Sequence, residues 1–189
     1  MFLDNNQVKS SKKGEFISIV KVNPVEKETL IKILNKKELS KEQESVKKRV
    51  IQLVDIEEYY ENTEIVNTND NLLRILTVKE NILVPIKLSN KKIEPDYINE
   101  IIDLFNIRSI LNNYPKDITF YEKQKVGIVK ALALKSKYII LDDVIKDLEY
   151  KESKEIMKLL DIVKLTYNQK ILIFTDNKKV AKKAKQCIC

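Results

Sequence analysis

The stretch that most constrains the fold is a short apolar run that ends on two adjacent carboxylates. Tyr138–Leu141 is followed directly by Asp142 and Asp143. A short apolar run of this kind is typical of a strand buried in a parallel sheet. In α/β folds, ligands bind at the carboxyl ends of such strands. The two acids are therefore predicted to lie at a functional edge of the sheet.

A capped helix is predicted just before this strand. Thr119 and Glu122 have the S/T-x-x-E spacing of a capping box, in which each side chain bonds the backbone of the other residue. Val126, Val129 and Leu132 then recur at the spacing of one helical face. The segment that ends at Asp143 is thus predicted to form a loop, a helix and a buried strand in succession.

A second unit of strand, loop and helix is predicted near the N-terminus. Phe16–Val20 is an apolar run, and the polar segment 21–29 follows it as a loop. Leu30, Ile33 and Leu34 then lie at helical spacing. A strand that leads through a loop into a helix is the context in which phosphate-binding P-loops occur.

The order of these segments resembles the ATP-binding subunit of ABC transporters. Ile118–Glu122 stands in the position of that family's L-S-G-G-Q signature. Asp142 and Asp143 stand in the Walker B position, and Leu148-Glu149 follows in the position of the D-loop. Leu76–Ile82 also has the pattern L-T-V-x-E-N-I, which is most like the ATPases of lipoprotein-release, macrolide-export and peptide-resistance transporters of bacteria.

The resemblance implies one domain over residues 1–189, with a P-loop NTPase-like α/β fold. We expect a mainly parallel sheet, flanking helices and an inserted helical subdomain at about residues 90–135. The succession of strand and helix signals favours the same class without the family. The resemblance covers most of residues 14–186, as a domain trimmed at both ends. An apolar run near Arg49–Asp55 predicts one further strand.

The residues at the P-loop position differ from the pattern G-x-x-x-x-G-K-[ST] that a phosphate cradle uses. Lys21 and Glu26 replace the two glycines, and Glu28 replaces the hydroxyl that would hold magnesium. Lys27 remains at the lysine position, and Thr29 follows. The cradle needs inward-pointing backbone N–H groups, and a carboxylate at Glu28 would repel phosphate. We therefore expect this loop to hold a triphosphate poorly.

The other positions that carry phosphate chemistry in the family are also changed. Phe120 and Tyr121 fill the place of the two signature glycines. Asp143 replaces the Glu that polarises the attacking water, and it is one methylene shorter. Asp176 replaces a His that contacts the γ-phosphate, and Thr68 takes the place of the Q-loop Gln. The resemblance is thus to a degenerate member of the family.

We predict a non-hydrolysing subunit, a pseudo-ATPase, that acts as a scaffold or regulator of a membrane ABC transporter complex. Asp142 and Asp143 are then vestigial catalytic candidates, and Lys27 and Thr29 are vestigial nucleotide-binding candidates. We expect no metal site and no ATP or Mg cofactor. The expected partners are a membrane permease subunit and an intact ABC ATPase or a second copy of the chain. The expected location is cytoplasmic, at the inner face of the membrane.

Two alternatives remain open at this stage. The first is a weak ATP-binding or ATPase subunit that uses Lys27, Thr29, Asp142 and Asp143 together with an intact partner. The second is a basic protein, of formal net charge +7, that binds anionic lipid or nucleic acid through Lys178–Lys185. The lysines are spread along the whole chain and no aromatic residues are interleaved in that cluster, so nucleic acid is not expected.

Composition limits the remaining chemistry. The chain has no His, which removes the commonest general base and metal ligand. Its two cysteines, Cys187 and Cys189, are too close for an ordinary structural disulfide and fit a reducing compartment. A lipid anchor at these cysteines is an alternative, but the start of a strand is preferred. No apolar run approaches the length of a membrane span.

Overall fold

The computed structural model describes residues 16–19, 24–34, 37–54, 63–67, 72–89, 91–136, 138–167, 169–175 and 186–188. Several sequence predictions concern positions outside the described residues: Lys21, Thr68, Asp176, Lys178–Lys185 and Cys189.

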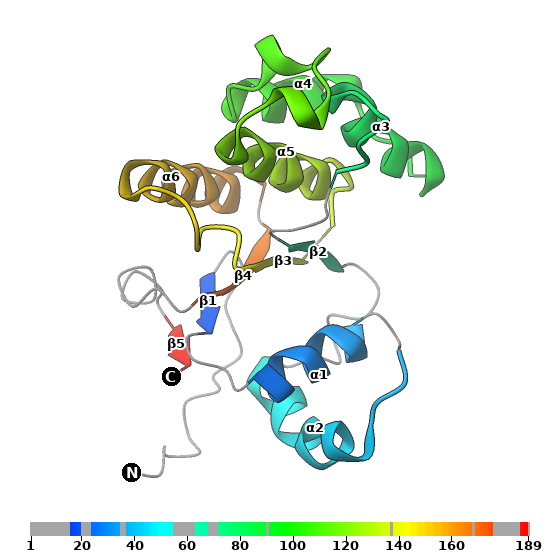
Figure 1. Ribbon diagram of the computed structural model, residues 1–189, viewed down its shortest axis with the longest axis vertical. Coiled ribbons are helices and arrows are strands. Elements are labelled where there is room, and N and C mark those ends of the chain that lie inside the picture. The colour runs from blue at the N-terminus through cyan, green and yellow to red at the C-terminus, as the bar shows by residue number, and fades with distance from the viewer. Residues whose placement is uncertain are drawn as a thin grey trace.

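A parallel sheet forms the centre of the molecule (Figure 1). Its strands in the described residues are β1 (Phe16–Ile19), β2 (Thr63–Asn67), β3 (Tyr138–Asp142), β4 (Lys170–Phe174) and β5 (Gln186–Ile188). They lie in the order β2-β3-β4-β1-β5, and every neighbouring pair is parallel. The predicted fold class, with its mainly parallel sheet, is confirmed.

Helices cover the two faces of the sheet as two layers. The α1–α2 layer consists of α1 (Pro24–Leu34) and α2 (Lys41–Val54). On the other face, α5 (Phe120–Ala133) and α6 (Tyr150–Tyr167) contact the sheet, and α3 (Val78–Leu88) and α4 (Pro95–Leu104) pack on α5. These four helices are called the α3–α6 layer. Figure 1 shows the first layer below the sheet and the second above it.

The strand side chains alternate between the two layers, because successive residues of a strand point to opposite faces. In β3, Ile139 and Leu141 join the apolar core under the α3–α6 layer, whereas Ile140 joins the core under the α1–α2 layer. In β4, Ile173 faces the first of these cores and Leu172 the second. The sheet is therefore buried on both faces, as its nearly continuous apolar strands require.

The strand predicted near Arg49–Asp55 is wrong, because residues 49–54 form the end of helix α2. The buried residues Gln43 and Val50, with the partly buried Val46 between them, recur at helical spacing. A short apolar run fits a strand and a buried helix equally well, and here the preceding helical stripe decides between them.

The capping box predicted at Thr119 and Glu122 is confirmed at the start of α5. A second capping box, at Thr77 and Glu80, starts α3. Helices α4 and α5 lie in the range predicted for a helical subdomain, and α3, which precedes that range, also packs against α5. None of the helices in the described ranges combines the length and apolar content needed to cross a bilayer.

Candidate functional site

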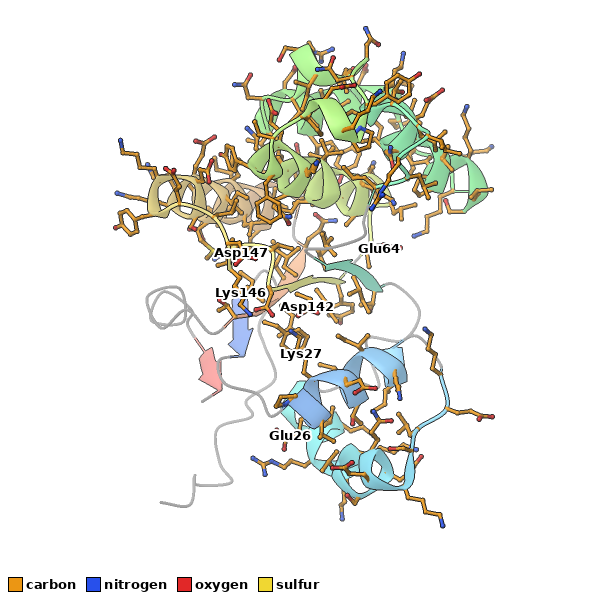
Figure 2. All side chains as sticks on the ribbon, in the orientation of Figure 1. Glu26, Lys27, Glu64, Asp142, Lys146 and Asp147 are labelled. Atoms are coloured by element: carbon orange, nitrogen blue, oxygen red, sulfur yellow. The ribbon has the colours of Figure 1, made fainter. Side chains whose placement is uncertain are left out.

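The candidate site lies where helix α1 meets the end of strand β3. Asp142 is the last residue of the strand and Asp143 follows it. Lys27, in the first turn of α1, forms ion pairs with both carboxylates, and its Nζ lies 2.8 Å from Oδ2 of Asp143. Figure 2 shows Lys27 extending from α1 towards Asp142. The structure thus brings together three of the four predicted site residues.

Burial and charge act against each other in this cluster. Burial favours the neutral form of Lys27, but hydrogen bonds and charge from Asp142 and Asp143 outweigh it and raise the lysine pKa. Burial also raises the pKa of Asp142, although the Lys27 ammonium opposes that rise. One cation between two carboxylates leaves the cluster with a formal excess of one negative charge.

The backbone at Asp143 has a left-handed conformation, with φ of 54°. This region is uncommon for a residue other than glycine, although Asp tolerates it better than most. The Asp143 N–H donates to the carbonyl of Phe174 at 3.1 Å, and the Asp143 carbonyl accepts from the N–H of Lys146 at 2.9 Å. These bonds fix the direction in which the second carboxylate leaves the strand.

Thr29, the fourth predicted site residue, is not brought to the carboxylates. Its side chain is fully buried, and its hydroxyl donates to the carbonyl of Val25 one turn earlier in α1 at 2.6 Å. Glu28 also departs from its expected position in the phosphate site. Its side chain is 61% exposed and pairs with Lys32, one turn later in α1, at 3.0 Å.

Glu26, at the position of the second P-loop glycine, has a side chain that is only 10% exposed and makes a contact that a glycine could not make. Its Oε1 lies 3.2 Å from Nε of Arg49 on α2. The side chain therefore connects the two helices of the α1–α2 layer.

The start of α5, at the position of the signature, carries rings where the family has glycines. Phe120 is 39% exposed, and the ring of Tyr121 lies 4.9 Å from the Nζ of Lys125. Lys125 is itself buried, and its Nζ approaches Oε1 of Glu155 on α6 at 3.7 Å. The helix start is kept as an N-cap, and Lys125 in the second turn contacts α6.

Asn81 is a structural residue that the sequence reasoning missed. Its buried amide donates to the carbonyls of Leu73, Leu76 and Thr77 at 3.0–3.1 Å, and its Oδ1 accepts from the N–H of Leu73 at 2.7 Å. These bonds hold the segment before α3, where Leu73 and Ile75 are 53% and 84% exposed. An Asn directly after the Glu of a capping box was the available signal.

The comparisons with known proteins agree with this fold. The family model of ABC transporters matches residues 5–146. A methionine import ATP-binding protein of Bacillus thuringiensis is 28% identical over 181 residues, which cover 92% of this chain and 53% of that protein. A protein of the same description from Listeria innocua is 28% identical over 90% of this chain and 52% of its own length. The chain therefore spans about half the length of the curated relatives that it matches.

The solved structures that resemble this one are also of ABC transporters. A putative metal-chelate type ABC transporter in an inward-facing conformation matches with a TM-score of 0.72 at 15% identity, over 94% of this chain and 68% of that chain. A dimeric bacterial ABC transporter cassette matches with a TM-score of 0.68 at 20% identity, over 94% of this chain and 81% of that chain. The family match, the relatives and the shared fold together show that this chain belongs to the ABC transporter family, as an ATP-binding domain of that family.

Proposed function

We propose that the chain is a non-hydrolysing pseudo-ATPase subunit that serves as a scaffold or regulator of a membrane ABC transporter complex. The observation that carries the proposal is the contact of Lys27 with Asp142 and Asp143. A lysine that binds phosphate oxygens needs its ammonium free for them. In this chain the ammonium is already held by the two carboxylates.

The charges of the cluster oppose a polyphosphate. Two unit charges 4 Å apart interact by about 4 kcal/mol at the effective dielectric of a protein surface. Asp142 and Asp143 together carry two negative charges, which Lys27 pairs with directly and Lys146 offsets by a smaller charge interaction with Asp142. A phosphate that displaced them from the ammonium would leave two carboxylates without their partner, beside a further anion.

The other side chains that would hold Mg-ATP in this family do not fit it here. The Thr29 hydroxyl is used inside its own helix, and Glu28 replaces the hydroxyl that would bind magnesium. Phe120 and Tyr121 occupy the positions at which glycines would let a nucleotide approach. Within the described residues, no group of three or more acidic or thiol side chains converges on a metal site.

The features of the family that this chain keeps are suited to packing and to binding a partner protein. Asn81 holds the segment before α3 in place, and that segment presents Leu73 and Ile75 to solvent. We propose this surface as the contact with a membrane permease subunit, on the cytoplasmic face of the membrane. An intact ABC ATPase or a second copy of this chain would be the other partner. The domain would comprise residues 1–189, with a helical subdomain at about 90–135.

The proposal also concerns the type of transporter to which the subunit belongs. The pattern at Leu76–Ile82 favours the lipoprotein-release, macrolide-export and peptide-resistance group. The relatives named above are methionine import proteins, and at 28% identity they give no closer assignment for this chain.

One alternative function has a specific observation in its favour. Lys27, Asp142 and Asp143 converge, which is what a weak ATPase would also require. In that case a nucleotide would have to release Lys27 from the acids. The basic-binder alternative rests on Lys178–Lys185, which lies outside the described residues.

Phosphate release in millimolar Mg-ATP tests the proposal against the weak-ATPase alternative, with a competent ABC ATPase run in parallel. We expect no turnover above background, and no difference between the protein, Lys27→Ala and Asp143→Glu. Turnover that Lys27→Ala abolishes would overturn the pseudo-ATPase assignment. The Asp143→Glu variant shows whether the shorter acid alone limits hydrolysis.

A further inference from the structure

The end of helix α3 is an exposed basic segment. Residues 87–92 have the sequence K-L-S-N-K-K, which contains three cations and no acid. Lys87, Leu88, Lys91 and Lys92 are all exposed. The described residues of this segment, 87–89 and 91–92, are called the α3 tip. Figure 1 shows α3 at the outer edge of the α3–α6 layer, beside the helix α5 on which it packs.

Hydrogen bonds fix the backbone of the α3 tip. The N–H of Ser89 donates to the carbonyl of Pro85 at 3.0 Å, and the Ser89 hydroxyl donates to the carbonyl of Ile86 at 2.9 Å. The N–H of Lys91 donates in turn to Oγ of Ser89 at 3.3 Å. The Nζ of Lys91 donates to the carbonyl of Leu134, directly after α5, at 3.1 Å. The tip is therefore held against the end of α5.

An apolar side chain is presented to solvent on this fixed turn. Leu88 is 78% exposed, and within the described residues it is one of the three most exposed large apolar side chains. A single exposed leucine needs no explanation by itself. Leu88, however, follows Lys87 directly and precedes Lys91 and Lys92. This is the chemistry of a lipid interface, where an apolar side chain enters the boundary of the acyl chains and ammonium groups stay at the headgroups.

The charge around the tip is unbalanced because acids are scarce there. Residues 72–93 contain five cations and one acid, an excess of four positive charges, whereas the whole chain has an excess of seven. The five cations are Arg74, Lys79, Lys87, Lys91 and Lys92. The one acid, Glu80, is held at the start of α3, where its carboxylate accepts from the N–H and the hydroxyl of Thr77, each at 2.8 Å. Residues 72–93 therefore produce a positive field.

Helix α4, which follows this segment, has the opposite charge. Residues 94–103 contain four acids and no cation. The acids are Glu94, Asp96, Glu100 and Asp103, and all four are exposed. Helices α3 and α4 both pack on α5, which fixes the positive and negative helices relative to each other. An anionic surface would attract α3 and repel α4, so the domain would bind it in one orientation.

We propose that the α3 tip binds an anionic lipid surface, with Leu88 at the boundary of the acyl chains and the lysines at the lipid phosphates. Charge complementarity favours this partner. A protein partner fits less well, because lysine is depleted in protein interfaces and their binding energy comes mostly from aromatic and Arg side chains. Residues 87–92 include no aromatic residue on which a nucleic-acid base could stack.

This lipid contact is separate from the permease contact proposed at Leu73 and Ile75, and from the cluster Lys178–Lys185. It requires neither a permease nor a nucleotide. It can therefore be tested, and can fail, independently of the proposed function.

Flotation of the purified full chain with lipid vesicles tests the proposal. The vesicles contain phosphatidylcholine alone, or equal parts of phosphatidylcholine and phosphatidylglycerol, at low and at high salt. Two variants change the tip: Leu88→Ser, and the double variant Lys87→Gln, Lys92→Gln. Lys91 is left unchanged because its Nζ holds the tip to α5.

Each variant has a matched control on α6. Leu165→Ser removes a leucine that is 79% exposed, and the double variant Lys154→Gln, Lys158→Gln removes two exposed lysines. All of the substituted side chains are exposed, so the variants should fold, and their thermal midpoints check this.

We expect the parent protein to bind the anionic vesicles, more strongly at low salt, and not to bind phosphatidylcholine alone. Each cation near an anionic surface strengthens binding about fivefold, so the Lys87→Gln, Lys92→Gln variant should bind about twentyfold more weakly. Leu88→Ser should weaken binding several-fold. The two control variants should change binding by about twofold or less, because charges away from the contact are screened.

Four results would overturn the proposal. The first is that the parent protein does not bind the anionic vesicles. The second is that the two lysine variants weaken binding equally, which would show attraction by net charge alone. The third is that Leu88→Ser binds as the parent protein does. The fourth is that a single-stranded oligonucleotide binds the tip lysines more tightly than the vesicles do, which would make the tip a nucleic-acid site.

Discussion

The two faces of the central sheet are built from the same strands but differ in how they are covered. On one face α5 and α6 contact the sheet and α3 and α4 pack on α5, whereas the other face carries the α1–α2 hairpin (Figure 1). Among the described side chains, the apolar core on the first face is the larger. Alternating residues of β3 and β4 supply both cores, so the difference originates in the helices. We therefore expect a truncation in the larger described core to cost more stability than one in the smaller core.

The difference matters for the candidate site because its parts belong to different regions. Asp142 belongs to the sheet, whereas Lys27 belongs to the α1–α2 layer (Figure 2). The geometry of the site consequently depends on how α1 is held against the end of β3.

Two matched truncations give the largest expected effects. Leu132 is fully buried under the α3–α6 layer, and Leu30 is 3% exposed under the α1–α2 layer. We expect Leu132→Ala to cost about 4–5 kcal/mol of unfolding free energy and Leu30→Ala about 2–3 kcal/mol, because the smaller core can relax around the cavity. Denaturant unfolding measures both losses of unfolding free energy. Equal losses would contradict the expected difference between the two apolar cores.

A tyrosine of the larger core gives the next prediction. Tyr97 donates to the carbonyl of Leu132 at 2.8 Å, so Tyr97→Phe should cost about 1 kcal/mol at neutral pH. The ring contacts with Tyr167 and Lys135 are kept in that variant. The expected loss is one of global stability, measured by denaturant unfolding.

The same tyrosine predicts a pH dependence. Burial, with smaller contributions from Tyr167 and Glu100, raises the pKa of Tyr97 above its ordinary value of 10.0. A folded-state pKa above the unfolded value gives stability that is complete below pH 10 and is lost as the pH rises from there. The stability difference between the parent protein and Tyr97→Phe should therefore shrink above pH 10. A difference that stayed constant to pH 11 would argue against the shift.

Two helix caps give the smallest expected effects. The Thr119 hydroxyl accepts from the N–H of Glu122 at the start of α5, and the Ser40 hydroxyl accepts from the N–H of Gln43 at the start of α2. Each Ala variant should cost about 0.5–1 kcal/mol. Denaturant unfolding measures both losses. A loss well above 1 kcal/mol in either variant would mean that the hydroxyl does more than cap its helix.

Local signals account for what the sequence predicted correctly. The apolar run before Asp142 and the spacing of Thr119 and Glu122 are each set by a few neighbouring residues. The strand predicted near Arg49–Asp55 was wrong because a short apolar run fits the spacing of a strand and that of a buried helix. The packing of that segment against the sheet decides between the two structures.

Tertiary packing decides the features that the sequence did not reveal. The pairing of Lys27 with the acids joins segments far apart in the chain. Glu28 pairs with Lys32 at the i,i+4 spacing of a helix, and the sequence did not show this because the loop predicted over 21–29 is helical from Pro24 onward. The role of Asn81 follows from how the preceding segment folds back onto α3, although its place after the Glu of a capping box was a local signal.

Thermal unfolding with and without millimolar Mg-ATP is the most direct test of the central claim, which is that the site does not bind a nucleotide. A ligand at one hundred times its dissociation constant adds about 2.7 kcal/mol, which raises the midpoint by several degrees. We predict no change in midpoint for the parent protein or for Lys27→Ala. A rise in the parent protein that Lys27→Ala abolishes would show that a nucleotide displaces the acids from Lys27, and would contradict the account.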